Sequence, residues 1–402
     1  MATYEMSPAH GAGARLARPV ELICFALIVA NVVYLADSYV QGLWLAPDGT
    51  GIVTDFVTIW AAGQMALAGH AAAAYDWPSL KLVDESVLGH RFDGYLGWPY
   101  PPTFFFVAAP LSQLPYVSAF VFWVSSTFLA YLAAIRAIIG DRVGYFLAAA
   151  FPAVLANFIV GQNGFLSAAL IGGTLTFMER RPICAGVLLG LLSYKPHLGL
   201  LFPIVLMASG RWWVFVTAAI VAALMAAASW AAFGSASWLA FFHGASHALV
   251  SDGVADWGKL QSAFGLTRAL GGSEPLAWSV QIVVALIAAG AITVLWRSRA
   301  TYEIKAAALA TGALLATPHL LTYDLVILAV PLAFLFRLGR AGRFPTYEMA
   351  GMGLACLLIM IFPFVKAPVG LAAILVVAAL IMNRALAPHH AASSRMIRYS
   401  PD

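Results

Sequence analysis

Residues 212–233 read WWVFVTAAIVAALMAAASWAAF, an apolar stretch without a charged side chain. A helix needs about 20 such residues to cross the roughly 30 Å of hydrocarbon in a bilayer. Similar runs recur along the 402-residue chain, which is 62% hydrophobic and 10% charged. Soluble domains carry about 25% charged residues. The sequence therefore predicts an all-α integral membrane protein, because helices satisfy their own backbone groups within lipid.

Composition also bears on cofactors and partners. The net charge of +4 comes from loop lysines and arginines and gives no reason to expect nucleic acid. Cys24, Cys184 and Cys356 all fall in apolar segments, so we expect no disulfide framework from them. His243 and His247 have i, i+4 spacing, but no third ligand completes a metal site. We expect neither a metal nor a cofactor.

Basic residues mark one end of the expected spans. The clusters are Arg15/Arg18, Arg136/Arg142, Arg180/Arg181, Arg211, Arg297/Arg299/Lys305, Arg337/Arg340/Arg343 and Arg384/Arg395/Arg398. Short loops rich in lysine and arginine stay in the cytoplasm, so all of these clusters are assigned there, with both termini inside. About 12 spans satisfy that assignment. They are expected at roughly 20–40, 117–135, 143–160, 162–178, 182–194, 196–209, 212–233, 276–296, 303–317, 320–337, 347–364 and 368–384.

Two places test this count of spans. Residues 182–194 and 196–209 are short enough to be one span broken at Pro196. We keep them separate because a merged span would move later arginine clusters outside the cytoplasm. Residues 101–115 are expected to form a re-entrant or interfacial segment for the same reason.

The predicted organisation is one transmembrane domain over residues 19–386, between cytoplasmic tails at 1–18 and 387–402. The apolar run from Val20 is too long for a signal peptide and is expected to remain as the first span. Two outer loops are expected, at about 41–100 and 234–275, and the second is polar enough to act as a lid.

The first outer loop is expected to hold two interfacial helices. Phe56–Ala68 is apolar and follows a possible N-cap at Thr54 or Asp55. Residues 79–88 alternate apolar and charged side chains with helical periodicity, which suits a helix in the plane of the interface.

Five polar clusters separate the apolar stretches, and all are expected at the outer end of the bundle. They are Thr54-Asp55-Phe56, Trp98-Pro99-Tyr100-Pro101-Pro102, Gly161-Gln162-Asn163, Tyr194-Lys195-Pro196-His197 and Pro318-His319-Leu320-Leu321-Thr322-Tyr323-Asp324. Polar groups gathered at one interface favour chemistry there over conduction of a solute.

Asp55 and Lys195 are the candidates with the clearest chemical roles. Asp55 opens the first interfacial helix, where it is either a plain N-cap or a general base. The roles are compatible, because one carboxylate oxygen can bind a backbone N–H while the other faces a substrate. Lys195 is either a snorkelling lysine or a phosphate ligand, since a buried ammonium without an anion is costly. His197 adds a second donor beside it.

The last cluster contains His319, Tyr323 and Asp324. On a helix, His319 and Asp324 would point roughly 140° apart, so a direct pair is not expected. His319 is therefore a candidate for a substrate or phosphate contact, and Asp324 for a packed structural group.

The remaining candidates have simpler alternatives. Gln162 and Asn163 lie between glycines, which predicts a tight hairpin whether or not they touch a substrate. Trp98 and Tyr100 suit a rigid wall for a sugar or a lipid chain, or an ordinary aromatic belt. Arg268 lies in the second outer loop, where it either neutralises a phosphate or is solvated.

In their order, these clusters resemble glycosyltransferase family 87 over most of residues 50–340. The motifs are Asp-Phe after the first span, Tyr-Pro-Pro, Gly-Gln-Asn, Lys-Pro-His and His-Leu-Leu-Thr-Tyr-Asp. The family groups polyprenol-phosphate-sugar-dependent enzymes and includes mannosyltransferases of phosphatidylinositol mannoside synthesis. The resemblance implies the membrane fold called GT-C, an acidic catalytic base in the first extracytoplasmic loop and a lipid-linked sugar donor.

Carried onto this chain, the resemblance assigns the base to Asp55, and Lys195 and His319 to the donor phosphate and polar contacts. Two features depart from what we would expect. Phe56 follows Asp55 where a second acid would support a divalent metal, and the second outer loop has little charge for an anionic acceptor. The acceptor therefore stays open.

We therefore expect a membrane glycosyltransferase that moves a hexose, mannose by resemblance, from a polyprenyl-phosphate sugar to a lipid or glycan acceptor. The reaction is expected at the extracytoplasmic face of the plasma membrane, with inversion of configuration. Lys195, His319 and Arg268 are assigned to the donor phosphate, and the substrate contacts are assigned to Tyr100, Gln162, Asn163, His197 and Tyr323. The alternative is a lipid or solute transporter, which would place ionisable groups near the middle of its spans.

Overall fold

The computed structural model describes residues 10–42, 52–247, 257–342, 344–365 and 367–387, and every regular element in these ranges is helical. The long apolar helices are α1 (His10–Val40), α5 (Tyr116–Ile139), α11 (Trp212–His247), α13 (Glu274–Arg297), η6 (Thr322–Leu328) continued by α15 (Ala329–Ala341), and α18 (Val369–Leu386). The shorter α-helices are α2 (Phe56–Leu67), α3 (Trp77–Leu88), α4 (Phe105–Leu111), α6 (Val143–Ala149), α7 (Ala153–Val160), α8 (Gly164–Phe177), α9 (Pro182–Leu191), α10 (Leu201–Ala208), α12 (Ala263–Ala269), α14 (Tyr302–Ala316), α16 (Thr346–Met360) and α17 (Phe362–Val365). The remaining 3₁₀ turns are η1 (Ala71–Tyr75), η2 (Pro102–Phe104), η3 (Leu192–Tyr194), η4 (Pro196–Gly199) and η5 (Trp257–Lys259).

The chain is a multi-pass membrane protein. Among the described residues, 6 helices are long and apolar enough to cross a bilayer, or 7 if the bent pair α6–α7 is one span. That pair bends by 62°, next to Pro152, which disfavours helical backbone at the residue before it. Each segment expected as a span contains helix, but several are shorter than 18 residues. The expected number of about 12 crossings therefore stays a prediction.

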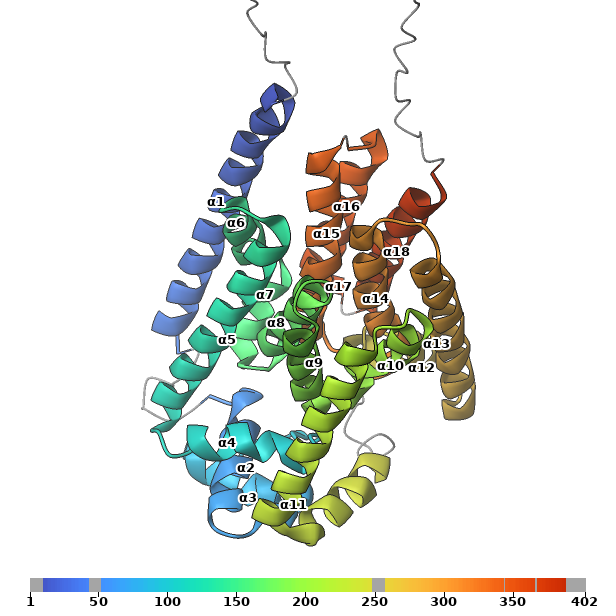
Figure 1. The fold of residues 1–402 in the computed structure, drawn as a ribbon. Coiled ribbons are helices and arrows are strands. Elements are labelled where there is room, and N and C mark those ends of the chain that lie inside the picture. The colour runs from blue at the N-terminus through green and yellow to red at the C-terminus, as the bar shows by residue number, and fades with distance from the viewer. Residues whose placement is uncertain (1–9, 43–51, 248–256, 343, 366, 388–402) are drawn as a thin grey trace, which may run out of the picture.

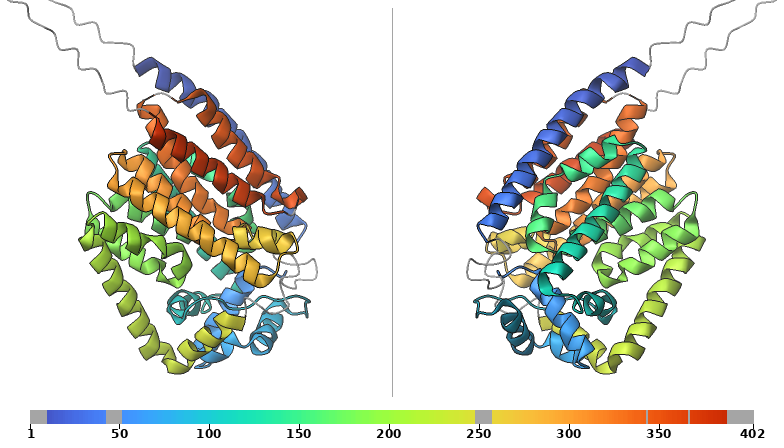
Figure 2. Two further views of the ribbon diagram at one scale, coloured as in Figure 1. Left: turned by 90° about the vertical axis from the view of Figure 1, so that its right-hand side faces the viewer. Right: turned by 90° about the vertical axis from the view of Figure 1, so that its left-hand side faces the viewer.

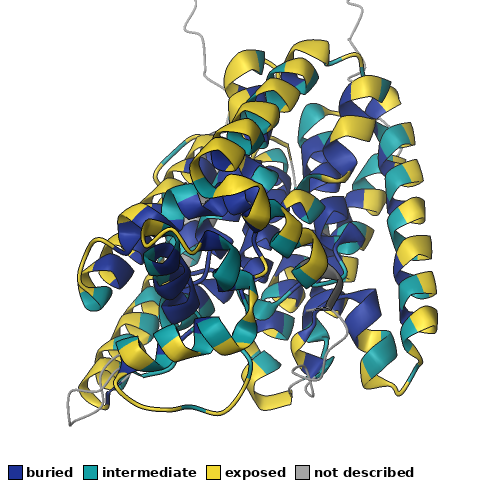
Figure 3. Cartoon of the chain, turned by 90° about the horizontal axis from the view of Figure 1, so that it is seen from below, coloured by how far each residue is buried: buried dark blue, intermediate teal, exposed yellow. Residues whose placement is uncertain are grey.

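The periphery of the bundle is apolar. In α1 only 6% of the most hydrophobic window is buried, which leaves its side chains to lipid. Figure 3 shows buried residues concentrated at the centre and exposed ones facing outward along the peripheral helices. Buried side chains from α2 to α18 form one continuous hydrophobic cluster.

Basic residues from several turns lie at one end of the bundle, called the basic end below. Arg340 pairs with Asp141 at 2.7 Å, which joins the turn after α5 to the end of α15. Arg211 pairs with Glu179 at 3.2 Å and lies 5.3 Å from the centroid of the Trp296 ring, so it joins three further turns. The prediction that these clusters share one side is confirmed for these turns, and their cytoplasmic location stays a prediction.

The opposite end holds a layer of short helices beneath the bundle (Figure 1). Here α2 packs on both α3 and α4. The helices expected at 56–68 and 79–88 are present as α2 and α3, and α4 lies in the segment expected to be re-entrant or interfacial. Asp76 caps α3 by accepting a hydrogen bond from the Ser79 backbone N–H at 3.1 Å.

The second expected loop differs from its prediction. The helix α11 does not end at residue 233 but bends at Gly234, whose φ of 79° and ψ of 162° lie outside helical values. Glycine adopts a positive φ without steric cost. The second half of α11 then turns back toward the layer of short helices and packs on η1 (Figure 2). An apolar helix therefore occupies the first part of this expected loop, to His247, and residues 248–256 lie outside the described residues; the role of the loop as a lid stays a prediction.

The expected tails fall mostly outside the structure. Residues 1–9 and 388–402 are outside the described residues, and α1 already begins at His10.

Candidate functional site

Asp55 stands at the N-cap position of α2, but its side chain makes no capping hydrogen bond. Its Oδ2 instead accepts a hydrogen bond from Gln162 Nε2 at 3.2 Å. Gln162 Oε1 accepts in turn from Tyr100 Oη at 2.8 Å. Asp55 therefore does not cap its helix with its side chain, and its carboxylate is held by Gln162 instead.

The turn between α7 and α8 brings Gln162 to Asp55. Gly161 ends α7 with a φ of 67°, and a Cβ there would lie 2.5 Å from Phe120 and 2.8 Å from Phe56. The Trp123 indole N–H donates to the Gly161 carbonyl at 3.0 Å. The expected tight hairpin is confirmed, and it is pressed against α2 and α5 so that the amide of Gln162 reaches the carboxylate.

Lys195 makes a buried ion pair with Asp324. Lys195 Nζ lies 2.6 Å from Asp324 Oδ1, and the two side chains are 5% and 2% exposed. The same ammonium lies 5.2 Å from the centroid of the Tyr323 ring. Buried charges are costly unless paired, so Asp324 supplies a counter-ion that the sequence did not assign. Binding of a phosphate by Lys195 stays a prediction.

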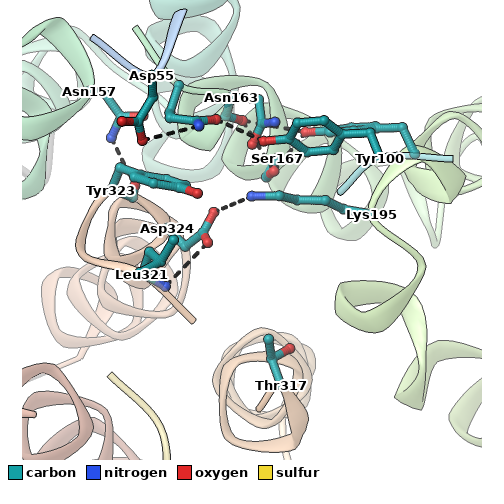
Figure 4. A network of polar contacts seen from close by, with 12 residues as sticks. Asp55, Tyr100, Asn157, Asn163, Ser167, Lys195, Thr317, Leu321, Tyr323 and Asp324 are labelled. Carbon is teal, nitrogen blue, oxygen red and sulfur yellow. Dashed lines mark hydrogen bonds and ion pairs between the residues drawn. The ribbon is translucent and has the colours of Figure 1, made fainter. Parts of the chain in front are cut away.

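The site has two halves, Asp55 with Gln162 and Lys195 with Asp324, and Tyr323 lies between them. Figure 4 shows its ring between Asp55 and the Lys195–Asp324 pair. Its backbone carbonyl accepts a hydrogen bond from Asn157 Nδ2 at 2.8 Å, which fixes the start of η6 against α7. Segments far apart in the sequence therefore bring one carboxylate and one ion pair to a common place.

Asn163 and Tyr100 make their contacts inside the protein. Both are buried, and the Asn163 side-chain amide has no hydrogen-bond partner among the described residues. The Asn163 backbone carbonyl accepts from Tyr194 Oη at 3.4 Å, and that hydroxyl also lies 2.7 Å from Ser167 Oγ. In this structure Tyr100 supports Gln162, and any contact of Tyr100 or Asn163 with a substrate stays a prediction.

His319 lies in an aromatic cluster next to this centre. Its ring lies 5.6 Å from that of Phe264 and 5.9 Å from that of Trp278, and its Nε2 is buried without a hydrogen-bond partner among the described residues. Burial lowers the pKa of His319 to about 4, so its ring is neutral at pH 7. His197 is half-buried and within electrostatic range of both Lys195 and His319.

Arg268 belongs to the same aromatic cluster as His319. Its guanidinium lies 4.6 Å from the centroid of the Trp257 ring, and Trp257 contacts Phe264. Its Nη1 donates to the Gly272 carbonyl at 2.9 Å. The structure thus links Arg268 to His319 only through the Trp257 and Phe264 rings, and a contact of Arg268 with a phosphate stays a prediction.

Lys259 is a further charged residue at the site, which the sequence did not single out. Burial raises the pKa of the Asp55 carboxyl above its ordinary value, whereas the hydrogen bond from Gln162 and the charge of Lys259 lower it. The segment after Lys259 is fixed, because Gln261 N donates to the Leu320 carbonyl at 2.7 Å and Ser262 Oγ donates to Pro318. No local motif marks Lys259, so only the fold reveals its position.

A small apolar hollow lies at Thr54, the residue before Asp55. It is lined by Ile52, Thr54, Tyr116, Val117 and Phe120 and is too narrow to hold a water molecule. The Thr54 hydroxyl lies 3.1 Å from the Tyr116 hydroxyl at its edge. Tyr116 begins α5, which is long and apolar enough to cross the membrane. The hollow therefore lies between Thr54 and the start of this helix.

The family to which this chain belongs can now be stated. The model of glycosyltransferase family 87 matches residues 98–318, more than half of the chain. The chain belongs to glycosyltransferase family 87. A membrane glycosyltransferase is therefore shown, and the resemblance seen in the sequence is confirmed. The match includes Tyr100, Gln162 and Lys195, whereas Asp55 and Asp324 lie outside it. Searches among curated proteins and among solved structures gave no match.

Proposed function

We propose that this glycosyltransferase moves a hexose from a polyprenyl-phosphate sugar to the hydroxyl of a lipid or glycan acceptor. Mannose is the proposed hexose on the family resemblance alone. The observation that carries the proposal is the convergence of Asp55 and the Lys195–Asp324 pair around Tyr323. A transporter would need ionisable groups near the middle of its spans, and the spans of this chain have almost none.

Asp55 acts as the general base in this proposal. It accepts the proton of the acceptor hydroxyl while the hydroxyl oxygen bonds to the anomeric carbon of the donor. The bond from that carbon to the phosphate oxygen breaks, and its electron pair leaves with the polyprenyl phosphate. The leaving group is a stable anion, so no general acid is required. A single displacement inverts the configuration at the anomeric carbon.

The charges around the site define how the phosphate is held. Asp324 balances the charge of Lys195, so what the pair offers a phosphate is the remaining N–H donors of the Lys195 ammonium and no net positive charge. Lys259 supplies positive charge on the Asp55 side, and neutral His319 supplies a ring N–H. Arg268, in the neighbouring aromatic cluster, is the last of the groups proposed to bind the phosphate. Donors fixed before reaction stabilise charge that develops in the transition state.

We assign the lipid part of the donor to the apolar hollow beside Thr54, which must widen to admit a prenyl chain. Its walls are mainly hydrocarbon and aromatic, and it adjoins the start of α5. A prenyl chain at this place would put the single phosphate of the donor near Asp55 and Lys259. The positive charge of Lys259 would then stabilise that phosphate.

The remaining architecture is proposed on the same basis. The chain would adopt a GT-C fold of about 12 spans, with one domain over 19–386 and both termini in the cytoplasm. The basic end would then face the cytoplasm. Asp55 and its partners would face the outer side of the plasma membrane.

Reconstitution tests this proposal directly. The full chain in liposomes would be incubated with radiolabelled polyprenyl-phosphate mannose, glucose or galactose and a membrane lipid extract. We expect one donor to give a labelled product with a new glycosidic bond. If label crosses the bilayer but no new glycoside forms with any of the donors, the chain is a transporter and the proposal is overturned.

A further inference from the structure

Three side chains of one short segment, the α7–α8 segment (residues 157–167), reach different parts of the site. Gln162 Nε2 donates to Asp55 Oδ2 at 3.2 Å. Asn157 in α7 and Ser167 in α8 make the other two contacts. Both are 0% exposed, so their side chains act inside the protein. Any part that they play in the reaction must therefore be exerted through the residues that they hold.

Asn157 holds the backbone of Tyr323, the residue before Asp324. Its Nδ2 donates to the Ala153 carbonyl at 3.0 Å and to the Tyr323 carbonyl at 2.8 Å. The segment approaches closely here, because a Cβ on Gly164 would lie 2.4 Å from the same Tyr323 oxygen. Since Asp324 follows directly, the contact fixes the backbone that carries the carboxylate of the ion pair.

Ser167 holds Tyr194, the residue before Lys195. The Ser167 Oγ lies 2.7 Å from the Tyr194 Oη, which also donates to the Asn163 carbonyl at 3.4 Å. The Tyr194 ring stacks on Phe104 with a centroid distance of 4.8 Å. Because Lys195 is the next residue, the contact fixes the backbone that carries the ammonium of the ion pair. The α7–α8 segment thus contacts the base directly and both members of the pair through their neighbours (Figure 4).

We propose that Asn157 and Ser167 are positioning residues, through which the α7–α8 segment sets the separation between the base and the ion pair. The inference rests on the proposed function, because only transfer requires both charged groups to meet one substrate. The acceptor hydroxyl, the anomeric carbon and the phosphate must then be aligned, and a misplacement of about 1 Å can cost about 10²-fold in rate. Loosening either contact should slow the chemical step while the phosphate still binds.

Steady-state kinetics of the reconstituted full chain test the Ser167 contact with small changes. Tyr194→Phe and Ser167→Ala each remove one hydroxyl from it. The donor would be whichever of polyprenyl-phosphate mannose, glucose and galactose is active. We expect each variant to lower kcat about threefold to tenfold and to leave KM for the donor within about twofold of the wild type. The double variant should be no slower than the slower single variant, because both changes remove one contact.

Tyr131→Phe is the matched control for Tyr194→Phe. The Tyr131 side chain is also 0% exposed, and its hydroxyl donates to the Ala148 carbonyl at 3.1 Å, which joins α5 to α6. This change removes a buried hydrogen bond of the same kind outside the site, so kcat should stay at the wild-type value.

Asn157→Ala tests the other contact, with a larger expected effect. It frees the backbone of Tyr323 and should lower kcat by about 10- to 10²-fold. Its melting temperature would be measured beside its activity, because a buried amide is lost. If Asn157→Ala does not fold, the comparison of Tyr194→Phe with Tyr131→Phe decides the proposal.

Three results would overturn the positioning role. They are equal kcat values in Tyr194→Phe and Tyr131→Phe, a rise in KM for the donor with kcat unchanged, or losses in Tyr194→Phe and Ser167→Ala that multiply in the double variant. Failure of the proposed function gives a different result, because the wild type would then form no glycoside from any of the donors. Failure of this inference alone would leave transfer by the wild type intact.

Discussion

The two halves of the site hold their charges in different ways. Asp55 is half-buried and held by a neutral amide, whereas Lys195 is almost fully buried and paired with Asp324 at 2.6 Å. Breaking an ion pair in a buried place is costly, so Lys195 is fixed in one state. A carboxylate that contacts an amide can take up a proton with much less rearrangement. The comparison assigns proton transfer to the Asp55 half and rigidity to the Lys195 half.

The largest expected effect is on the Asp55 half. Asp55→Asn keeps the shape of the side chain and its contact with Gln162 but removes the base. General-base catalysis contributes about 10²–10⁴-fold, so the transfer rate should fall by that factor while the melting temperature stays close to wild type. Asp93→Asn is a matched control, because Asp93 lies exposed in the same loop. Normal turnover by Asp55→Asn would show that Asp55 is not the general base.

The Lys195 half should respond through stability. Asp324→Asn leaves a buried ammonium without its counter-ion, which should cost about 3–5 kcal/mol in the free energy of unfolding. The double variant Lys195→Met/Asp324→Leu should recover much of that loss, measured by thermal unfolding in nanodiscs. The pair Arg340–Asp141 is a control at the basic end, with side chains 33% and 40% exposed. Arg340→Gln should cost no more than about 1 kcal/mol. A similar loss in Asp324→Asn and Arg340→Gln would contradict the comparison.

A second buried acid gives a pH-dependent prediction. Asp84 lies on the buried face of α3, and neither of its carboxyl oxygens has a hydrogen-bond partner among the described residues. Burial, reinforced by Glu85, raises the pKa of Asp84 from 3.8 to about 8. Between these values the unfolded chain loses this proton and the folded chain keeps it. Stability should therefore fall as pH rises through this window, by at most about 1.4 kcal/mol per pH unit.

Asp84→Asn should remove this contribution to the pH dependence. The melting temperature of the variant, measured from pH 4 to about 8, should fall less steeply with pH than that of the wild type. Asp76→Asn does not serve as a control, because Asp76 caps α3. Asp93→Asn does, and it should leave the slope unchanged. Equal slopes for wild type and Asp84→Asn would show that Asp84 is ionised in the folded protein.

The smallest expected effect concerns the amide that holds the base. The pKa of Asp55 is raised by burial and lowered by Gln162 and Lys259. Because the base acts only when deprotonated, the acidic limb of the pH dependence of kcat/KM should lie above the ordinary range of an aspartate. Gln162→Leu should move that limb to higher pH, since it removes a hydrogen bond to the charged form. Gln113→Leu, at an exposed position, should not move it.

Much of the architecture could be predicted from the sequence. Long apolar runs and arginine clusters predicted the helices, the shared basic end and the two short helices α2 and α3, because these features follow from local periodicity and charge. The convergence of Asp55, Gln162, Lys195 and Tyr323 followed from their positions at the same ends of the spans. The family resemblance added the order of the motifs.

The partners of the charged residues could not be predicted in the same way. Lys195 and Asp324 are 129 residues apart, and no periodicity links them. The effect of Lys259 on Asp55 depends on a loop that is fixed only by contacts with Leu320 and Pro318. The bend of α11 depends on one glycine in an otherwise continuous apolar run, so its second half was assigned to a polar loop.

The stereochemistry of transfer tests the central claim, that one carboxylate drives one displacement. A donor of known anomeric configuration would be supplied to the reconstituted chain, and the configuration of the new glycosidic bond would be read by NMR from its anomeric proton and carbon. We predict a product of the opposite configuration to the donor. Retention of the donor's configuration would require two displacements and would contradict the role given to Asp55.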